Sequence, residues 1–337
     1  MILSEFEFLF NNNDFQGTVK KNESLSKHTT ICAGGKANFF VEPENTESLV
    51  YAVKKFHELK LNFFVLGGGS NVIFSEKGTD IVLSTRKLSG IDLIKTPETG
   101  NFILSVQAGT SWGKILDFCK KNNLGGLERF SGLSGTVGGA VFMNATCFSL
   151  SVSDVLKEVC YLEIPSLCKK NYSFCSSDWS YKKSFFNTKN TGALRGENQA
   201  EFPAEGVAAN KVDAQGETSP SKIILSGNFN VVSGFNEKEA QETLEKRKSM
   251  GHFRSPSAGS AFKNIPEKNL IAGKLIDECG LKGFSIGGAQ IAPWHGNFFI
   301  NPQNKANGSD FFMLRDFVIK TVKEKTGIIL EPEIIYI

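Results

Sequence analysis

The sequence predicts an α+β protein with more than one domain. Segments with strand and helix patterns are mixed along the chain, without the strict alternation of an α/β fold. At 337 residues the chain is long enough for two or three domains, each with its own core. Three loops rich in glycine and other small residues interrupt these segments, and they are the most distinctive feature of the sequence.

The first third of the chain predicts a small sheet with one helix and one glycine loop. Strand patterns occupy residues 38–41, 62–66, 72–74 and 81–84, and helical spacing of apolar residues covers 46–59. The second of these strands leads directly into Gly67-Gly68-Gly69-Ser70-Asn71, which cannot be a regular element. We expect this loop to allow the close approach of a ligand, although simple turns use the same residue types.

The middle of the chain contains the longest glycine-rich loop, residues 130–146. A strand over 102–108 and a helix over 112–122, capped by Thr110 or Ser111, precede it. Successive N–H groups and hydroxyls of such a loop can surround a phosphate. The residues that would supply these groups are Ser131, Gly132, Ser134, Gly135, Thr136, Gly138 and Gly139. The loop matches neither the phosphate loop of nucleoside triphosphatases nor a GxGxxG dinucleotide fingerprint. A phosphate cradle and a set of tight turns both remain open.

A long polar segment follows a pair of strands at 155–164 and 172–176. Residues 181–186 form a short basic patch beside aromatic side chains, and residues 187–221 are then poor in aliphatic and aromatic residues. Because residues 187–221 cannot bury enough apolar area to offset the entropy lost on ordering, we expect them to form a mobile insertion. The strand pattern resumes at 223–232.

The last third combines helices with the third small-residue loop, residues 255–264, which ends in Lys263 and Asn264. The predicted helices are 237–250, capped by Asn236, then 270–279, closed by Gly280, and a final helix begun by Ser309 or Asp310 and closed by Gly327. The predicted strands are 298–301 and a β-rich tail over 328–337, which contains Glu331 and Glu333.

Composition and charge argue against several classes of protein. The net charge of +3 is too small to indicate nucleic acid or a charged membrane surface as a partner. The seven cysteines lack a CxxC pair and the four histidines lack metal-ligand spacing, so we expect reduced thiols, a cytoplasmic location and no metal. No apolar run approaches the ~20 residues of a membrane span, and residues 1–10 make a poor signal peptide. No obligate protein partner is indicated.

In their order along the chain, the motifs resemble those of the UDP-N-acetylenolpyruvoylglucosamine reductase (MurB) family of flavoenzymes. Residues 67–71 and 131–145 look like its two flavin loops, 181–184 like its YRxS motif, and 257–264 like its Ser-Ala-Gly-Ser-x-Phe-Lys-Asn segment. The similarity continues through 272–283, 295–301 and 330–333, and it covers about residues 25–337 except the insertion. The shared order is the specific signal.

The resemblance implies a vanillyl-alcohol-oxidase/p-cresol-methylhydroxylase-type FAD-binding fold with a C-terminal α+β substrate domain. The implied segments are FAD-binding subdomains at 1–83 and 84–234, the second with the insertion 187–221, a substrate-binding domain at 235–325, and a strand at 326–337 that returns to the first subdomain. FAD would be the bound cofactor and NADPH the co-substrate.

The resemblance also implies a reaction, in which the enolpyruvyl ether of UDP-N-acetylglucosamine is reduced to UDP-N-acetylmuramate for peptidoglycan synthesis. Ser260 matches the family's proton donor, and Lys263 is near enough in sequence to stabilise its alkoxide. Glu333 matches the catalytic glutamate, although Glu331 has the same chemistry two positions away. At the third catalytic position Lys182 replaces the family's arginine, and a register slip would put Lys183 there.

The binding residues are implied by the same motifs. For FAD they are Gly67, Gly68, Gly69, Ser70, Asn71, Gly132, Ser134, Gly135, Thr136, Gly138, Gly139 and Asn144. For the diphosphate and uridine of the substrate they are Lys263, Asn264, Arg247 and His295. Arg247 could equally be a surface helix residue, and His295 could be a packed loop histidine.

Departures from the family pattern keep alternatives open. Ser134 replaces a usual proline, and residues 146–149 replace Gly-Ala-Tyr-Gly. Because no tyrosine lies between Tyr181 and Tyr336, the chain resembles the shorter-loop branch, which lacks a lid tyrosine. The alternatives are a nucleotide-sugar or flavin-binding protein with weakened catalysis, and another flavin oxidase of the same fold.

Overall fold

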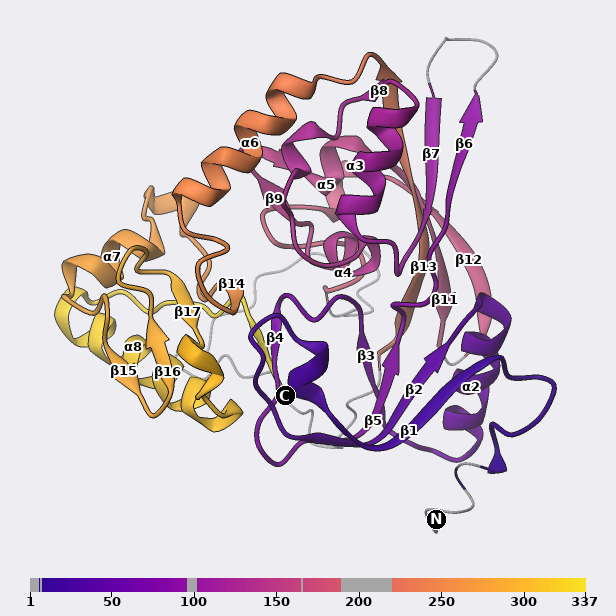
Figure 1. Ribbon diagram of the computed structural model, residues 1–337, viewed down its shortest axis with the longest axis horizontal. Helices are drawn as coiled ribbons and strands as arrows, with labels where there is room; N and C mark the ends of the chain where they lie inside the picture. The colour runs from indigo at the N-terminus through magenta and orange to yellow at the C-terminus, as the bar shows by residue number, and fades with distance from the viewer. Residues whose placement is uncertain (1–5, 7, 96–101, 165, 189–219) are drawn as a thin grey trace, which may run out of the picture.

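The computed structural model describes residues 6, 8–95, 102–164, 166–188 and 220–337. In this part of the chain, three larger β-sheets and their helices surround a central region (Figure 1). Strands and helices are mixed without regular alternation, which confirms the α+β class. The predicted insertion, 187–221, lies outside the described residues except for its two ends, 187–188 and 220–221.

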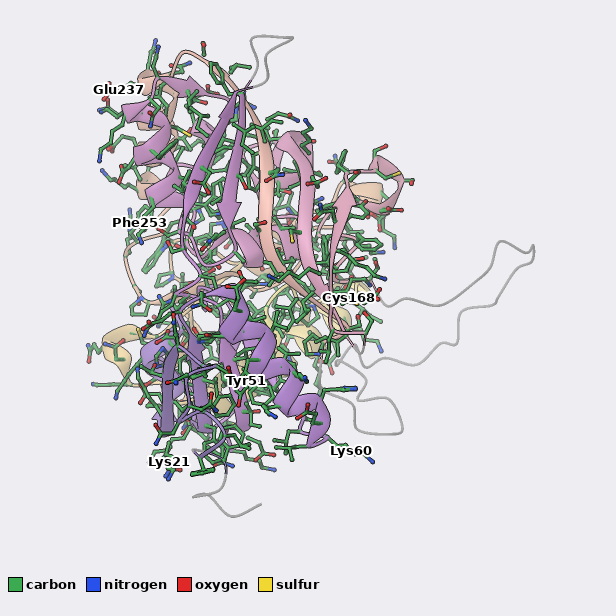
Figure 2. All side chains as sticks on the ribbon, turned by 90° about the vertical axis from the view of Figure 1, so that its right-hand side faces the viewer. Lys21, Tyr51, Lys60, Cys168, Glu237 and Phe253 are labelled. Atoms are coloured by element: carbon green, nitrogen blue, oxygen red, sulfur yellow. The ribbon has the colours of Figure 1, made fainter. Side chains whose placement is uncertain are left out.

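The first sheet comes from the N-terminal part of the chain. Its strand order is β1 (Gly17–Ser24), β2 (Lys36–Pro43), β5 (Thr79–Ser84) and β3 (Phe64–Leu66), with β1 antiparallel to β2 and the other pairs parallel. Helix α2 (Thr46–Glu58) packs Leu49, Val53 and Phe56 against it, as their spacing predicts. Figure 2 shows this helix from the side, with Tyr51 labelled on it.

Strand β1 was not predicted, because its sequence is polar and charged. Gly-Thr-Val-Lys-Lys-Asn-Glu-Ser has no apolar alternation, and the strand forms because it pairs with β2 from Gly17 opposite Pro43 to Ser24 opposite Lys36. It is an edge strand, where lysine side chains discourage pairing with another chain. The missed strand therefore depends on its neighbour rather than on its own pattern.

The second sheet is antiparallel. Its strand order is β12 (Cys168–Ser173), β11 (Leu156–Glu163), β13 (Lys222–Ser233), β7 (Phe102–Gln107) and β6 (Ile91–Lys95), and β8 (Leu124–Gly125) pairs with the end of β13. Helix α3 (Trp112–Lys121) begins at its N-cap Ser111 and places Trp112 in the core. The Trp112 ring lies 4.3 Å from the Phe130 ring and 5.9 Å from the Phe229 ring, between centroids.

The long glycine-rich loop and the residues directly after it form short elements that the sequence did not predict. They are α4 (Val137–Phe142), the hairpin strands β9 (Thr146–Cys147) and β10 (Leu150–Ser151), and α5 (Val152–Val155). Helix α4 lies close to the end of β7, since the Gly138 N–H donates to the Ala108 carbonyl at 2.8 Å. A Cβ on Gly138 would lie 3.1 Å from the Ala108 Cβ, so glycine permits this approach.

The third sheet follows helix α6 (Glu237–Ser249), which is capped by Asn236 as predicted. Its strand order is β14 (Ser257–Ser260), β17 (Phe298–Ile300), β16 (Ala289–Ile291) and β15 (Ser285–Ile286), and α7 (Ala272–Glu278) and α8 (Gly308–Thr326) belong to the same core. Residues 257–260 were predicted as loop. They form β14 because they pair with β17 around a bulge.

The start of α8 corrects a predicted cap. Asn307 is the N-cap rather than Ser309 or Asp310, and its Oδ1 accepts a hydrogen bond from the Asp310 N–H at 2.9 Å. The Asp310 carboxylate accepts in return from the Asn307 N–H at 3.1 Å. This capping box uses both residues, so residue type alone did not separate the cap from its partner. Gly327, with φ +73°, ends the helix as predicted.

The end of the chain returns to its N-terminal part. Strand β18 (Ile335–Tyr336) pairs in parallel with β4 (Val72–Ile73), and the C-terminus lies beside β4 in Figure 1. We propose the division at 1–83, 84–234, 235–325 and 326–337, since each of the first three ranges holds one of the three larger sheets and β5 exceeds its boundary by one residue. Among the described residues, no helix combines the length and the apolar character of a membrane span.

Candidate active site

A cavity of about 1250 Å³ lies where the three sheets meet. All three small-residue loops line it, together with the last residues of the chain. Of the residues predicted to bind a cofactor, those that line the cavity are Gly67, Gly68, Gly69, Ser70, Asn71, Gly132, Ser134, Gly135, Thr136, Gly138 and Gly139. The structure therefore brings together loops that are far apart in the sequence.

The first two loops pack directly on each other. A Cβ on Gly68 would lie 2.5 Å from the Gly135 Cα, and the Ser70 hydroxyl donates to the Ser134 carbonyl at 3.2 Å. Glycine is therefore needed at position 68 for the contact between the two loops. Gly139 differs, because the nearest atom to a Cβ there is Thr136 Oγ1 at 4.0 Å.

Thr136 has an unsatisfied group at this open position. Its hydroxyl oxygen is buried and has no hydrogen-bond partner among the described residues. Buried polar groups are nearly always hydrogen-bonded, so this hydroxyl and the space at Gly139 suit a polar ligand. The two loops thus form a cradle that a side chain on Gly139 would fill.

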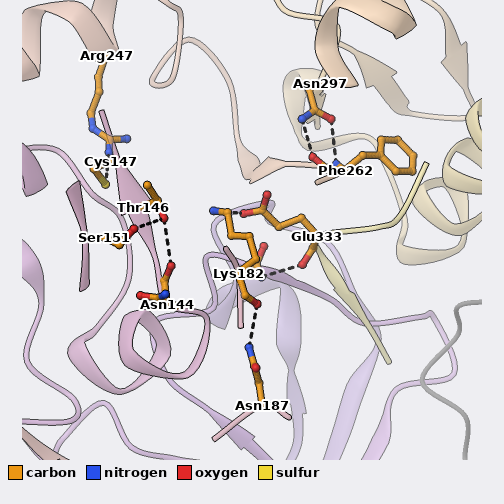
Figure 3. A network of polar contacts seen from close by, with 11 residues as sticks. Asn144, Thr146, Cys147, Ser151, Lys182, Asn187, Arg247, Phe262, Asn297 and Glu333 are labelled. Atoms are coloured by element: carbon orange, nitrogen blue, oxygen red, sulfur yellow. Dashed lines mark hydrogen bonds and ion pairs between the residues drawn. The ribbon is translucent and has the colours of Figure 1, made fainter. Parts of the chain in front are cut away.

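Lys182 and Glu333 form an ion pair in the cavity, with 2.6 Å between Nζ and Oε1. Each side chain is only 12% exposed, and the two point toward each other from distant segments (Figure 3). Glu333 is held by its backbone, since its N–H donates to the Ala261 carbonyl at 2.9 Å and its carbonyl accepts from Asn71 Nδ2 at 3.1 Å. This arrangement keeps a cation and an acid together in a largely dry place.

The segment that carries Lys182 is fixed by hydrogen bonds from two side-chain amides and one hydroxyl. Asn187 Nδ2 donates to the Lys182 carbonyl at 3.2 Å, and the Ser184 hydroxyl donates to the Phe142 carbonyl at 2.7 Å. Asn144 Nδ2 donates to the Ser180 carbonyl at 2.9 Å. Lys182 itself has φ +58°, a left-handed conformation that is costly for a side-chain-bearing residue. The surrounding bonds hold it there.

Asn144 therefore does not lie where a cofactor-binding residue was expected. It is outside the cavity lining, and its Oδ1 accepts from the Ser153 N–H at 3.1 Å. With Nδ2 bonded to Ser180, both ends of the amide are used within the protein. The side chain connects the second loop to the Lys182 segment, so its role in this structure is to support the site.

Ser260 lines the cavity at the end of β14, next to Gly259 with φ +81°. Among the described residues, its hydroxyl makes no hydrogen bond within the protein. The expected neighbour Lys263 instead pairs with Glu331, with 2.5 Å between Nζ and Oε1. The Glu331 side chain is 60% exposed, in contrast to Glu333. Of the two acids, Glu333 is the one enclosed in the site.

The other predicted substrate residues divide into one inside the cavity and two outside it. Arg247 lines the cavity and is 7% exposed, so it is not a surface helix residue. Asn264 is exposed outside the lining, and its Oδ1 accepts from the Ala272 N–H at 3.0 Å. His295 stacks on Phe298 with 3.8 Å between ring centroids. That stacking makes it the packed loop histidine of the alternative interpretation.

Basic side chains outnumber acidic ones around the cavity. The basic lining residues are Lys182, Lys183, Lys222, Arg247, Lys263 and Arg315, and the acidic ones are Glu331 and Glu333. Six cations and two carboxylates favour a ligand with several negative charges. Arg315 was not predicted to be a site residue. Its guanidinium stacks on Tyr336, 4.5 Å from the ring centroid, and this contact between distant residues leaves no motif around Arg315 in the sequence.

His252 is a further cavity residue that the sequence motifs did not indicate. Its ring packs edge-on against Phe298, with 4.6 Å between centroids. The pKa of His252 falls to about 4, mainly because the ring is buried. The positive charges of Arg247 and His295 lower it further. The ring is therefore neutral at pH 7.

This pKa predicts a loss of stability in acid. In the unfolded chain His252 takes up a proton near its ordinary pKa, whereas in the folded chain it does so only near pH 4. The free energy of unfolding is therefore unaffected by this group above about pH 6.5 and decreases by about 1–3 kcal/mol as the pH falls toward 4. His252→Phe keeps a ring but cannot be protonated, and its urea midpoint should decrease less between about pH 7 and about pH 5 than that of the wild type. Equal decreases in both proteins would contradict the assignment.

Comparison with known proteins identifies the family. Residues 37–164 match the model of an FAD-binding domain, and residues 251–337 match that of the UDP-N-acetylenolpyruvoylglucosamine reductase C-terminal domain. The chain is 39% identical over 338 residues to the reductase of that name from Treponema denticola, covering 98% of this chain and 97% of the relative. The chain belongs to the UDP-N-acetylenolpyruvoylglucosamine reductase family.

Other comparisons agree with this family. The reductase from Borreliella burgdorferi is 32% identical, with 94% of each chain covered. The crystal structure of the reductase (MurB) from Thermus caldophilus superposes with a TM-score of 0.68 and 25% identity, covering 96% of this chain and 99% of the other. The resemblance stated from the motifs and the predicted FAD-binding fold with its C-terminal domain are both confirmed.

As a member of the UDP-N-acetylenolpyruvoylglucosamine reductase family with an FAD-binding domain, the protein is a flavin-dependent oxidoreductase. The cavity fits FAD. The unsatisfied Thr136 hydroxyl and the open space at Gly139 suit the oxygens of its diphosphate, and the excess of lining cations offsets their charge.

Proposed function

We propose that this protein catalyses the NADPH-dependent reduction of the enolpyruvyl ether of UDP-N-acetylglucosamine to UDP-N-acetylmuramate, a step of peptidoglycan precursor synthesis. The observation that carries the proposal is the cavity itself, where Ser260 and the Lys182–Glu333 pair face one cation-rich space bounded by the two glycine loops. Relatives with this printed name support the substrate, since the chain aligns with them over nearly its whole length.

We propose that the two glycine loops hold FAD. The residues that would hold it are Gly67, Gly68, Gly69, Ser70, Asn71, Gly132, Ser134, Gly135, Thr136, Gly138 and Gly139, all of which line the cavity. When bound, FAD supplies the two-electron chemistry by taking a hydride from NADPH and delivering one to the alkene. The surrounding protein excludes water and orients the substrate.

Lys182 would bind the carboxylate of the enolpyruvyl group. Reduction of the double bond places negative charge on the carbon beside this carboxylate, and an ammonium group nearby stabilises that charge. The Glu333 carboxylate, 2.6 Å from the Lys182 Nζ, fixes the position of the ammonium group. Because the pair is only 12% exposed, its electrostatic effect is screened less than that of a surface pair.

Ser260 would hold the proton that completes the product. Its hydroxyl lines the cavity and makes no hydrogen bond within the described residues, so it is available to the carbon next to the carboxylate. Lys263 is close along the chain, but its ammonium group pairs with Glu331. We therefore propose Lys263, with Arg247, for the negatively charged diphosphate of the substrate.

A cytoplasmic location is part of the proposal. All seven cysteines are free thiols in the structure, which is typical of a reducing compartment. The missing lid tyrosine also stays a prediction: the sequence between Tyr181 and Tyr336 contains no tyrosine, and the segment 189–219 lies outside the described residues.

The function is tested by absorbance spectroscopy and a coupled assay. Purified protein should be yellow, lose its flavin absorbance on anaerobic addition of NADPH, and oxidise NADPH continuously only when UDP-N-acetylenolpyruvoylglucosamine is present. Oxygen-dependent turnover without this substrate would instead indicate an oxidase. A yellow protein that binds the sugar nucleotide without turnover would indicate a binding protein.

Replacing Lys182 by arginine tests the departure from the family motif. We expect Lys182→Arg to have equal or higher kcat/KM, because a guanidinium can bind a carboxylate through two hydrogen bonds and can also pair with Glu333. Backbone strain does not change, since the positive φ is equally costly for lysine and arginine. Steady-state kinetics with the sugar nucleotide measures this. A large decrease would show that the site requires the shape of lysine.

A further inference from the structure

Arg247 is held from two sides by the β9–β10 hairpin. Its Nη2 donates to the Cys147 sulfur at 2.8 Å, as Figure 3 shows, and its Cζ lies 5.4 Å from the centroid of the Phe148 ring. Cys147 is 3% exposed and Arg247 7% exposed, so this contact is enclosed. The hairpin departs from the family pattern at both contact positions, where Ala and Tyr are usual.

The hairpin turn that carries the Phe148 ring has a strained backbone. Cys147 pairs with Leu150, which leaves Phe148 and Ser149 as the two turn residues, with φ +45° and +69°. Turns of this kind favour Asn-Gly, since positive φ is costly for other residues. The ring nevertheless packs against α6, where Lys246 Nζ also lies 4.6 Å from its centroid. The turn therefore presents an aromatic face to Arg247.

Arg247 lacks the partner that a buried cation needs. Its Nε is buried without a hydrogen-bond acceptor, and among the described residues no carboxylate forms an ion pair with the guanidinium. An enclosed charge without a counterion is unfavourable. Because Arg247 also lines the cavity, the natural partner is an anionic ligand there.

The thiol of Cys147 suits this task. A carboxylate at position 147 would pair with Arg247 and cancel its charge, whereas a neutral thiol accepts one N–H and leaves the charge available. Burial raises the pKa of the Cys147 thiol despite the nearby Arg247 and Lys182, so it stays protonated at pH 7.

We infer that Cys147 and Phe148 are positioning residues that orient Arg247 toward an anionic oxygen of the ligand in the cavity. The inference rests on the proposed function, because that oxygen belongs to the sugar nucleotide or to the diphosphate of FAD. It adds two residues that act through Arg247 and do not themselves touch the ligand.

The test compares Cys147→Ala, which removes the acceptor, with Cys147→Ser, which keeps one. Cys147→Ala should raise either the KM for UDP-N-acetylenolpyruvoylglucosamine or the Kd for FAD by about 10-fold, with kcat at saturating substrate and FAD within about twofold of wild type. The first result assigns Arg247 to the substrate and the second to FAD. Cys147→Ser should recover most of the loss.

Two controls separate positioning from stability. Cys119→Ala removes another buried thiol, 1% exposed and outside the cavity lining, and should leave both constants unchanged. In an Arg247→Met background, Cys147→Ala should add less than about twofold, because no guanidinium remains to be oriented. Thermal denaturation of each variant reports folding, and Phe148→Leu serves as the second variant if Cys147→Ala does not fold.

Wild-type KM and FAD affinity in Cys147→Ala would overturn the inference. The inference would also be overturned if Cys147→Ala weakened binding equally in the wild type and in the Arg247→Met background. If the wild type does not oxidise NADPH with the sugar nucleotide, the proposed function fails separately. In that case calorimetric titration of the same variants with UDP and with FAD still decides whether Cys147 acts through Arg247.

Discussion

Replacing Ser260 by alanine is expected to stop turnover while leaving the bound flavin reducible by NADPH. Loss of a positioned proton donor typically lowers kcat by ~10²–10⁴-fold. The first half of the reaction should be unaffected, because hydride transfer from NADPH needs no proton from this hydroxyl. Anaerobic stopped-flow spectroscopy of flavin reduction, followed by addition of UDP-N-acetylenolpyruvoylglucosamine, measures the two halves separately.

The Ser260 result has a clear control on the same sheet. Ser285, on β15, is exposed and lies outside the cavity lining, so Ser285→Ala should behave as the wild type. If Ser260→Ala reoxidises its flavin with the sugar nucleotide at the wild-type rate, another group supplies the proton. If flavin reduction itself is lost, the serine supports the binding of NADPH or FAD instead.

The second large effect is expected for Glu333→Gln, compared with Glu331→Gln. Removing the Glu333 charge leaves the Lys182 ammonium group without the partner that fixes it at 2.6 Å, so the charge that stabilises the transition state is misplaced and kcat should fall by ~10²–10³-fold. Glu331 is 60% exposed, and exposed ion pairs contribute only about 0–1 kcal/mol, so Glu331→Gln should keep kcat within a few fold. Both variants are measured by steady-state NADPH oxidation.

The same pair of variants can reverse the assignment. An active Glu333→Gln with an inactive Glu331→Gln would move the essential acid to the more exposed position. It would also make the Lys263–Glu331 pair, rather than Lys182–Glu333, the centre of the site. Loss of activity in both variants would show that the reaction requires both acids.

The glycine loops illustrate what local sequence patterns predict well. Residues 67–71 and most of the predicted residues in 131–145 line one cavity, because glycines and small hydroxyl residues determine loop conformation over a few positions. The capped helices α2, α3 and α6 were predicted for the same reason, since caps and apolar spacing act within one or two turns.

The differences concern side chains whose partners lie elsewhere in the chain. Asn144, Asn264 and His295 are residue types that bind ligands, yet the first two bond to backbone groups and His295 stacks on Phe298. Residue type states what a side chain can bond to, but packing selects the partner. Arg315 shows the opposite case, because it reaches the cavity by stacking on Tyr336 without any motif around it.

From the sequence alone, the α+β class, the order of the loops, most helix ends and the family could be determined, because these depend on neighbouring residues and on motif order. Only the tertiary structure decided that Lys182 pairs with Glu333, that Lys263 pairs with Glu331, and that Arg247 is buried against Cys147. Such pairings join segments that are far apart in the sequence, and their distances are set by how the elements pack in three dimensions. No periodicity within a segment carries that information.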